Sequence, residues 1–163
     1  MVFFVYLRMD YNSGQYEFKK DISTGVKGEN QIRGILESRG FKFINSCQNN
    51  SYDLKMSYGD KEYTYEIKTD VYPRDTGNLV VEFESRGKSS GIAVTNADFF
   101  VTFFPRLGEI WNIRTEDLRG LISKINPVIF ENSGDANSKT RLYKLKKSEV
   151  RQFFKIHSIA IEK

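Results

Sequence analysis

The chain has 163 residues, 39% of them hydrophobic and 14% aromatic, enough to fill the core of one ordinary domain. It has no run of about 18 apolar residues, and no basic segment precedes the short apolar start Met1–Leu7, so we expect no membrane span, no signal peptide and a cytoplasmic protein. The single cysteine, Cys47, and the single histidine, His157, exclude an internal disulfide and a His- or Cys-rich zinc site. Any metal would be bound mainly through carboxylates, which favours Mg²⁺, Mn²⁺ or Ca²⁺.

The net charge of +4 is unevenly spread along the chain. Residues 139–163 carry eight basic side chains against two acidic ones, a net charge of +6, which leaves −2 over residues 1–138. This asymmetry suits a polyanionic partner, and it equally suits a C-terminal helix with a solvated face. With three prolines, no repeats and no break in composition, residues 1–163 are expected to form a single domain.

Periodicity and turn residues predict the first elements in chain order. The start Met1–Met9 is a candidate strand. A helix is expected over Val26–Arg39, with Thr24 or Gly25 near its start and Gly40 as its C-terminal stop. Further strands are predicted at Ser51–Tyr58, Glu62–Lys68, Leu79–Glu84, Phe99–Phe104 and Glu109–Ile113. Of these, Phe99–Phe104 is a nearly continuous apolar run, which indicates a strand covered on both faces.

The second half of the chain continues the mixture of helices and strands. Thr115 is expected to cap a helix that runs to about Lys124, and Ser148 to cap a short helix over Glu149–Phe154. Strands are expected at Val128–Phe130 and Leu142–Leu145, with a loop over Gly134–Lys139. This order predicts an α/β or α+β domain with a central mixed sheet flanked by helices.

The segment Tyr52–Lys68 carries the most information. With Gly59–Asp60 as a two-residue hairpin turn, one face of the hairpin is wholly apolar and pairs Tyr52 with Ile67, Leu54 with Tyr65 and Met56 with Tyr63. A slip of one residue would mix apolar and polar side chains on each face, so the pattern supports this register.

The polar face of the same hairpin places Asp53 directly across from Glu66, with Cβ atoms about 4.5–5.5 Å apart. Like charges in this position destabilise a sheet, and a bridging divalent cation would offset their repulsion. Lys68 lies on the same face, where its ammonium could hold a water or stabilise charge on a phosphate. A plain salt bridge from Lys68 explains the pairing equally well.

Glu29 supplies a third carboxylate. It precedes Ile32 and Leu36 by three and seven residues, which places it beside the core-facing stripe of its helix, where a free carboxylate is costly. The alternative explanation is an acid that is favoured by the helix dipole near the N-terminus.

The order Glu29, Asp53 and Glu66-Ile67-Lys68 resembles the PD-(D/E)XK nuclease superfamily, which carries an Asp-(x)12-Glu-x-Lys motif after a helical Glu. The segments Gly28-Glu29 through Leu36 and Arg39-Gly40-Phe41 are similar in layout to archaeal Holliday-junction resolvases and to phage endonuclease I. Val81 to Ile92 and Ala97-Asp98 resemble phage-encoded members. Tyr52 stands where the motif usually has proline.

This resemblance implies a restriction-endonuclease-like fold and a function. Asp53 and Glu66 would ligate Mg²⁺ or Mn²⁺ with help from the backbone carbonyl of Ile67, and Glu29 would reach the metal directly or through water. Lys68 would orient the attacking hydroxide. The implied reaction is hydrolysis of a phosphodiester bond in DNA, with no small-molecule cofactor.

Other residues are secondary candidates. Glu82, Glu84 and Ser85 could line the cleft, or Glu82 and Glu84 could form a solvated polar face. Arg86 and Lys88 lie in a glycine-containing loop that could approach a phosphate backbone or be a plain connection. In the basic C-terminal segment, the candidate DNA contacts are Lys144, Lys146 and Lys147.

These observations lead to the hypothesis of a phage-encoded endonuclease that acts on branched DNA such as Holliday junctions in the host cytoplasm. Since a symmetric junction needs two coordinated cuts, we expect a homodimer, whose interface would be the Phe99–Phe104 region or the N-terminal strand. The alternatives are a less selective DNA-degrading or end-trimming nuclease, a catalytically silent DNA-binding module, and a structural or virion protein.

Overall fold

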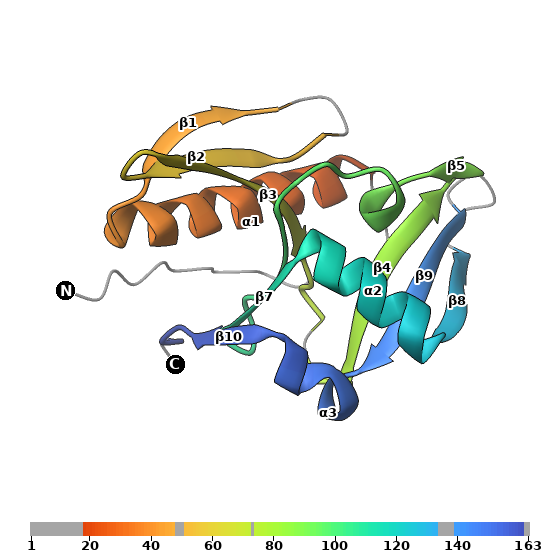
Figure 1. Ribbon diagram of the computed structural model, residues 1–163. Helices are drawn as coiled ribbons and strands as arrows, with labels where there is room; N and C mark the ends of the chain where they lie inside the picture. The colour runs from red at the N-terminus through yellow and green to blue at the C-terminus, as the bar shows by residue number, and fades with distance from the viewer. Residues whose placement is uncertain (1–17, 48–50, 73, 134–138, 162–163) are drawn as a thin grey trace.

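The computed structural model describes residues 18–47, 51–72, 74–133 and 139–161, whose strands form two sheets (Figure 1). The larger sheet contains β1 (Lys42–Ser46), β2 (Leu54–Tyr58), β3 (Lys61–Thr69), β6 (Phe99–Phe104), β7 (Glu109–Arg114) and β10 (Lys155–Ser158). Its strand order is β1-β2-β3-β6-β7-β10; β3 and β6 are parallel, and the other neighbours are antiparallel. The expected α+β class with a mixed sheet is confirmed.

A second, antiparallel sheet contains β5 (Lys88–Ser89), β4 (Asn78–Ser85), β9 (Lys139–Lys146) and β8 (Val128–Ser133), in that spatial order. Three of its strands were predicted from the sequence, but their separation from the central sheet was not. Together with the short 3₁₀ helix η1 (Gly91–Ala93), β4 and β5 make up the connection between the parallel strands β3 and β6. This connection places β4 close to the centre of the molecule.

The first helix, α1 (Phe18–Ser38), begins well before the predicted start at Val26 and passes through Thr24 and Gly25. It ends where expected, because Gly40 adopts a φ of +92°, a conformation that glycine reaches without strain. Its buried side makes a close contact with β3, so the middle of the helix, which carries Glu29, is held against the predicted hairpin.

Both predictions of helix caps are wrong. The second helix, α2 (Thr115–Ile125), has Arg114 at its N-cap position, and the Thr115 hydroxyl is buried without a hydrogen-bond partner among the described residues. Because its side chain is only 2% exposed, Thr115 packs into the core instead of turning back to the helix. Ser148 lies inside the one-turn helix α3 (Lys147–Val150), which continues as the 3₁₀ helix η2 (Arg151–Phe153).

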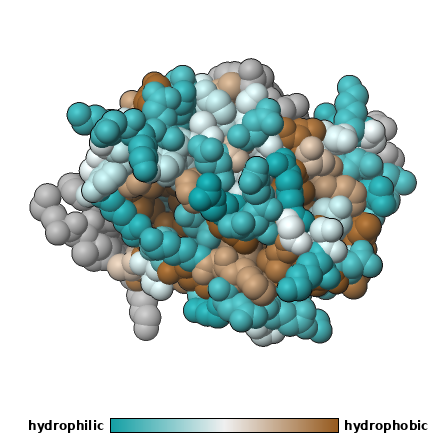
Figure 2. All heavy atoms as spheres, viewed as in Figure 1, coloured by the Kyte–Doolittle hydropathy of each residue, from teal (hydrophilic) through white to brown (hydrophobic). Residues whose placement is uncertain are grey.

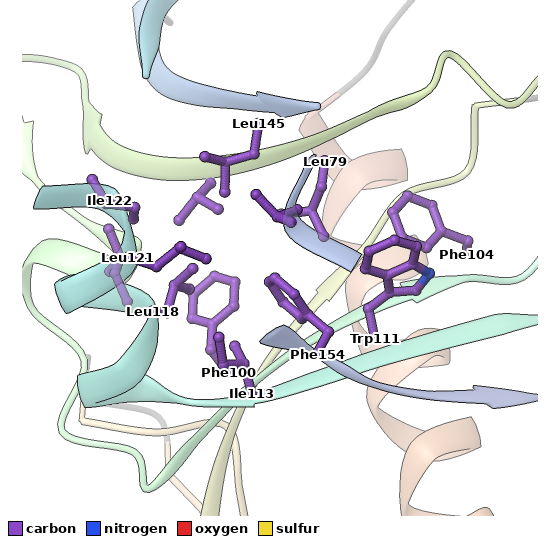
Figure 3. Close-up of a cluster of buried hydrophobic side chains, with 13 residues drawn as sticks. Leu79, Phe100, Phe104, Trp111, Ile113, Leu118, Leu121, Ile122, Leu145 and Phe154 are labelled. Atoms are coloured by element: carbon purple, nitrogen blue, oxygen red, sulfur yellow. The ribbon is translucent and has the colours of Figure 1, made fainter. Parts of the chain in front are cut away.

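Two apolar clusters lie on opposite faces of the six-stranded sheet, because alternate residues of β6 and β7 point to opposite sides. On one face, Ile32 of α1 packs over the hairpin and over Val101, Phe103 and Ile110. On the other face, side chains of both sheets and of α2 meet, and Figure 3 shows Leu79 and Leu145 of the second sheet opposite Phe100, Ile113 and Leu118.

The structure corrects one of the expected interfaces. Strand β6 lies between β3 and β7, and five of its six residues are buried, as its apolar sequence predicted. The Phe99–Phe104 region therefore offers no exposed apolar surface for a partner. The other candidate, the N-terminal strand Met1–Met9, lies outside the described residues, as does most of the predicted loop Gly134–Lys139.

Exposed apolar side chains gather instead on the edge strand β8. Val128, Ile129 and Phe130 are 72%, 48% and 49% exposed, and Figure 2 shows apolar surface at the side of the molecule where this strand lies. Within the described ranges, no helix has the length and apolar character needed to cross a bilayer.

Candidate active site

The hairpin of β2 and β3 has the predicted register. Leu54 is paired with Tyr65, Met56 with Tyr63 and Ser57 with Glu62, and the turn at Gly59 has a φ of +61°. The predicted apolar face is buried under α1, with Met56 fully covered. The polar face is consequently directed to the other side of the sheet, toward β4 and η1.

Asp53 immediately precedes β2, outside the paired residues of the hairpin, so its predicted pairing with Glu66 stays a prediction. Its backbone N–H donates a 2.9 Å hydrogen bond to the carbonyl of Tyr65, and its Oδ2 accepts a 2.7 Å hydrogen bond from the N–H of Ile67. These two bonds hold Asp53 against β3 between Tyr65 and Ile67, near enough to Glu66 for the charge of that residue to act on its carboxylate. The structure thus shows the Ile67 amide orienting the Asp53 carboxylate, whereas the proposed role of the Ile67 carbonyl as a metal ligand stays a prediction.

Glu66 is a nearly buried carboxylate with a different partner at each oxygen. Its side chain is 10% exposed; Oε1 lies 3.2 Å from Nζ of Lys68, and Oε2 accepts a 3.2 Å hydrogen bond from the Thr95 hydroxyl. Both oxygens are therefore held in defined positions on the polar face of the hairpin.

Glu29 reaches this group because α1 comes unusually close to β3. A Cβ at Gly28 would lie 1.8 Å from the Thr69 hydroxyl oxygen, so only glycine permits this approach. The next residue, Glu29, lies close enough to Asp53, Glu66 and Lys68 for their charges to act on its carboxylate. The structure thus brings together the four residues that the sequence predicted to be catalytic.

Burial and mutual repulsion both act on the carboxyl groups of the site. Burial, followed by the charges of Asp53 and Glu66, raises the pKa of Glu29 to about 7 against the opposing effect of Lys68. Burial and the charge of Glu66 raise the pKa of Asp53 to about 6, although the Ile67 amide and Lys68 act to lower it. One ammonium group therefore does not neutralise three carboxylates.

Lys68 is held in its charged form by its neighbours. Burial acts to lower its pKa, but the charges of Glu66, Glu82 and Asp53 and the hydrogen bond to Glu66 outweigh burial, so the pKa of Lys68 is raised. The ammonium group therefore stays protonated at neutral pH and is available as a hydrogen-bond donor and a positive charge.

The donor set fits a hard divalent cation. Asp53, Glu66 and Glu29 lie near one another, and burial together with their mutual repulsion raises the pKa values of Asp53 and Glu29. Over the described residues, no three His, Cys, Asp or Glu side chains form a complete cage for a metal ion. Mg²⁺ is commonly bound by one or two carboxylates and keeps several waters, so a pair of carboxylates with a third nearby fits it.

The secondary candidates on β4 separate into two groups. Glu82 lies close enough to Lys68 to raise the pKa of that lysine, so it belongs to the site. Glu84 instead lies 3.5 Å from Nη1 of Arg141 on the neighbouring strand, and a bulge between Glu82 and Glu84 interrupts the expected common face. Ser85 is paired with Lys88 and Thr140 at the end of the strand.

The predicted basic contacts also separate in space. Arg86 lies with Gly87 in the two-residue turn between β4 and β5, where both residues have a positive φ, and Lys88 follows on β5. Lys146 is paired with Asn78 at the opposite end of β4, about 25 Å away at 3.3 Å per residue, and its Nζ lies 3.2 Å from Glu149. The exposed Lys144 lies between these two ends.

Lys147 is a correction to the predicted DNA contacts. It is 7% exposed, its Nζ lies 3.0 Å from Asp75, and the ammonium packs 3.9 Å from the centre of the Phe104 ring. The buried pocket of aromatic rings and one carboxylate removes it from the basic surface. Its position next to Lys146 in the sequence gave no sign of this, because its partners come from distant segments.

Two residues near the site were missed in the sequence. Thr95 binds Glu66, and Arg119 of α2 binds the carbonyls of Ile92 and Thr95. A lone threonine in a connecting segment and one arginine on a polar helix face carry no local signal of such contacts.

Comparison of the chain with protein-family models, with curated proteins and with solved structures gives no match. Any function must therefore be argued from the chemistry of this group of side chains.

Proposed function

We propose that this protein is a metal-dependent DNA endonuclease of the PD-(D/E)XK type. The observation that carries the proposal is the grouping of Asp53, Glu66 and Lys68 of the hairpin segment with Glu29 of α1, where burial and mutual repulsion raise the pKa values of Asp53 and Glu29. The mixed sheet and the order of these residues along the chain agree with the resemblance found in the sequence.

Each residue of the group has a role in this proposal. Asp53 and Glu66 hold the divalent cation, and Glu29 contributes directly or through a water. When bound, the cation supplies Lewis-acid polarisation of the phosphate and a lowered pKa for water. Lys68, kept charged by its neighbours, donates hydrogen bonds that orient the attacking water and stabilise the charge that develops on the phosphate. Glu82 adds to the negative field that keeps Lys68 protonated.

DNA is the substrate that the charge distribution favours. The chain carries a net charge of +4 despite its acidic site, and Arg86 and Lys88 lie at the tip of the hairpin that β4 forms beyond Glu82. Such a tip can contact phosphates a few nucleotides from the bond that is cut. Branched DNA is the preferred form in this proposal, and the paired cuts that a symmetric junction requires would be made by a homodimer.

Cleavage of a panel of end-labelled DNAs tests the proposal: a four-way junction, a flap, a single strand and a linear duplex, each in Mg²⁺ or EDTA. We expect cutting only with Mg²⁺, preference for the junction with paired symmetric nicks, and a loss of at least about 100-fold in Asp53→Asn and Glu66→Gln. The matched control is Glu62→Gln, since Glu62 lies on the same hairpin but is 54% exposed and binds Lys55.

Each outcome has a separate meaning. Equal cutting of all duplexes would favour the less selective nuclease, and salt-sensitive DNA binding without any cutting would favour the silent binding module. Cleavage by Asp53→Asn or Glu66→Gln at the rate of the wild type would contradict the catalytic assignment.

A further inference from the structure

The segment between η1 and β6 contacts the candidate site at two points. Thr95, which is 1% exposed, lies in this segment and contacts Glu66 on β3. Its neighbour Asn96 donates a 2.8 Å hydrogen bond to the carbonyl of Ser51, two residues before Asp53. The segment therefore links β3, which carries Glu66, to the residues just before Asp53.

The Thr95 hydroxyl has one proton and several neighbours. It accepts a 3.2 Å hydrogen bond from the N–H of Ala97, and it lies 3.2 Å from Oε2 of Glu66 and 3.3 Å from the carbonyl of Ser51. A hydrogen bond to a carboxylate is the stronger of the two possible donations, so the proton is assigned to Glu66. Oε2 of Glu66 is thereby fixed, while Oε1 is turned toward Lys68.

Arg119 holds this segment from the other side. Its Nη2 donates to the carbonyls of Thr95 at 2.6 Å and of Ile92 at 2.9 Å, and its Nε donates to Ile92 at 3.1 Å. The guanidinium thus ties η1 and Thr95 to α2 with a planar, multidentate contact that lysine cannot reproduce.

The 3₁₀ helix η1, which precedes this segment, packs closely against β4. Gly91 has a φ of +50°, and a Cβ there would lie 2.3 Å from the carbonyl oxygen of Glu82. The segment therefore has little freedom to move relative to Glu82, Glu66 or α2.

We infer that Thr95 is a positioning residue, held in place by Arg119, that fixes the Glu66 carboxylate in the orientation needed to bind a divalent cation. This inference rests on the proposed function, because it assigns Glu66 to the cation. Without the hydroxyl, Oε2 of Glu66 would lose its buried partner, and the carboxylate would turn toward Lys68 or water.

Binding of Mn²⁺ by calorimetry and steady-state cleavage of DNA test the inference in Thr95→Val, Thr95→Ser and the wild type. We expect Thr95→Val to weaken Mn²⁺ binding by about 10- to 100-fold and to lower kcat with the KM for DNA nearly unchanged. Thr95→Ser keeps the hydroxyl and should recover most of both. The control is Thr115→Val, which removes an equally buried hydroxyl that has no partner among the described residues and should change neither.

A folded Thr95→Val protein with the Mn²⁺ affinity and kcat of the wild type overturns the inference and leaves the proposed function intact. A wild type that neither binds Mn²⁺ nor cuts DNA overturns the proposed function, and the inference with it. If Thr95→Val does not fold, Arg119→Lys provides the second variant: it should also weaken Mn²⁺ binding at an unchanged KM, and an affinity equal to that of the wild type would overturn the inference.

Discussion

Asp53 and Glu29 are carboxyl groups that the folded protein holds with pKa values near 6 and 7, above the usual values near 4. Between about pH 4 and about pH 7, these two groups hold protons in the folded state that they have released in the unfolded state. The free energy of unfolding therefore falls as the pH rises through this range. The free energy of unfolding is therefore lower at neutral pH than near pH 4, because the site then holds buried negative charge. Such a loss of stability is expected where a cation is to be bound.

Asp53→Asn should stabilise the metal-free protein at neutral pH, because the amide keeps the acceptor for the Ile67 N–H without the charge. We expect the free energy of unfolding to rise by about 1–2 kcal/mol at pH 8 and to stay unchanged below about pH 4. The rise is smaller than the full pKa difference implies, because solvent screens the charge. Thermal unfolding in EDTA across this pH range measures it, with Asp60→Asn in the exposed hairpin turn as control. A pH-independent difference between Asp53→Asn and the wild type would contradict the assigned cause.

The residues of the site differ in how far the sequence reveals them. Asp53, Glu66 and Lys68 could be placed together because a hairpin register is a local property that one turn and one apolar face determine. Lys147 and Thr95 could not be placed, because their partners Asp75 and Glu66 lie far away in the sequence and only the packed fold brings them into contact.

At the scale of the elements, the contact between α1 and β3 determines where Glu29 lies. Gly28 and Thr69 touch so closely that any side chain at position 28 must push the helix away from the strand. This contact explains a glycine within a long helix, where glycine otherwise lowers stability.

Gly28→Ala should therefore destabilise the protein by about 1–3 kcal/mol through overpacking and lower the cleavage rate by displacing Glu29. Gly34→Ala in the same helix is the control: nothing lies within 4 Å of its added methyl group, so the higher helix propensity of alanine should leave stability unchanged or raise it by up to about 1 kcal/mol. Chemical denaturation and cleavage assays measure both, and equal behaviour of the two variants would contradict the role of the close contact.

Elements were predictable where the signal is local. The hairpin and β6 follow from alternation and from a continuous apolar run, respectively, and Gly40 marks the end of α1. The second sheet was not predictable, because β4 pairs with β9 across more than fifty residues and alternation does not reveal the partner of a strand. The early start of α1 was missed because only Phe18 and Ile22 are apolar among the eight residues before Val26, and Thr24 and Gly25 are typical of a helix start.

At the scale of the whole molecule, the predicted basic contacts are spread along the second sheet. Arg86 and Lys88 lie at the β4–β5 turn, and Lys146 lies at the far end of β4, with Lys144 between the two ends. Since Lys147 is buried, the basic C-terminal segment offers fewer contacts than its charge of +6 indicates.

The dependence of DNA affinity on salt should report which lysines touch phosphate. Neutralising Lys144 and Lys146 to Gln should reduce the slope of log K against log salt by about 1 for each phosphate that is no longer neutralised, whereas Lys147→Met should leave the slope unchanged. Fluorescence anisotropy with a labelled duplex, in EDTA to prevent cleavage, measures these slopes. A reduced slope in a folded Lys147→Met protein would show that the buried lysine takes part in binding after all.

The account depends most directly on whether Asp53 and Glu66 bind a divalent cation together. Titration of the full chain with Mn²⁺ in a calorimeter, in two buffers of different ionisation enthalpy near pH 6.5, measures both affinity and proton release. We predict binding accompanied by release of protons, because the cation displaces them from Asp53 and Glu29, with loss of binding in Asp53→Asn and Glu66→Gln but not in Glu62→Gln. Absence of binding in the wild type, or equal binding in all four proteins, would contradict the account.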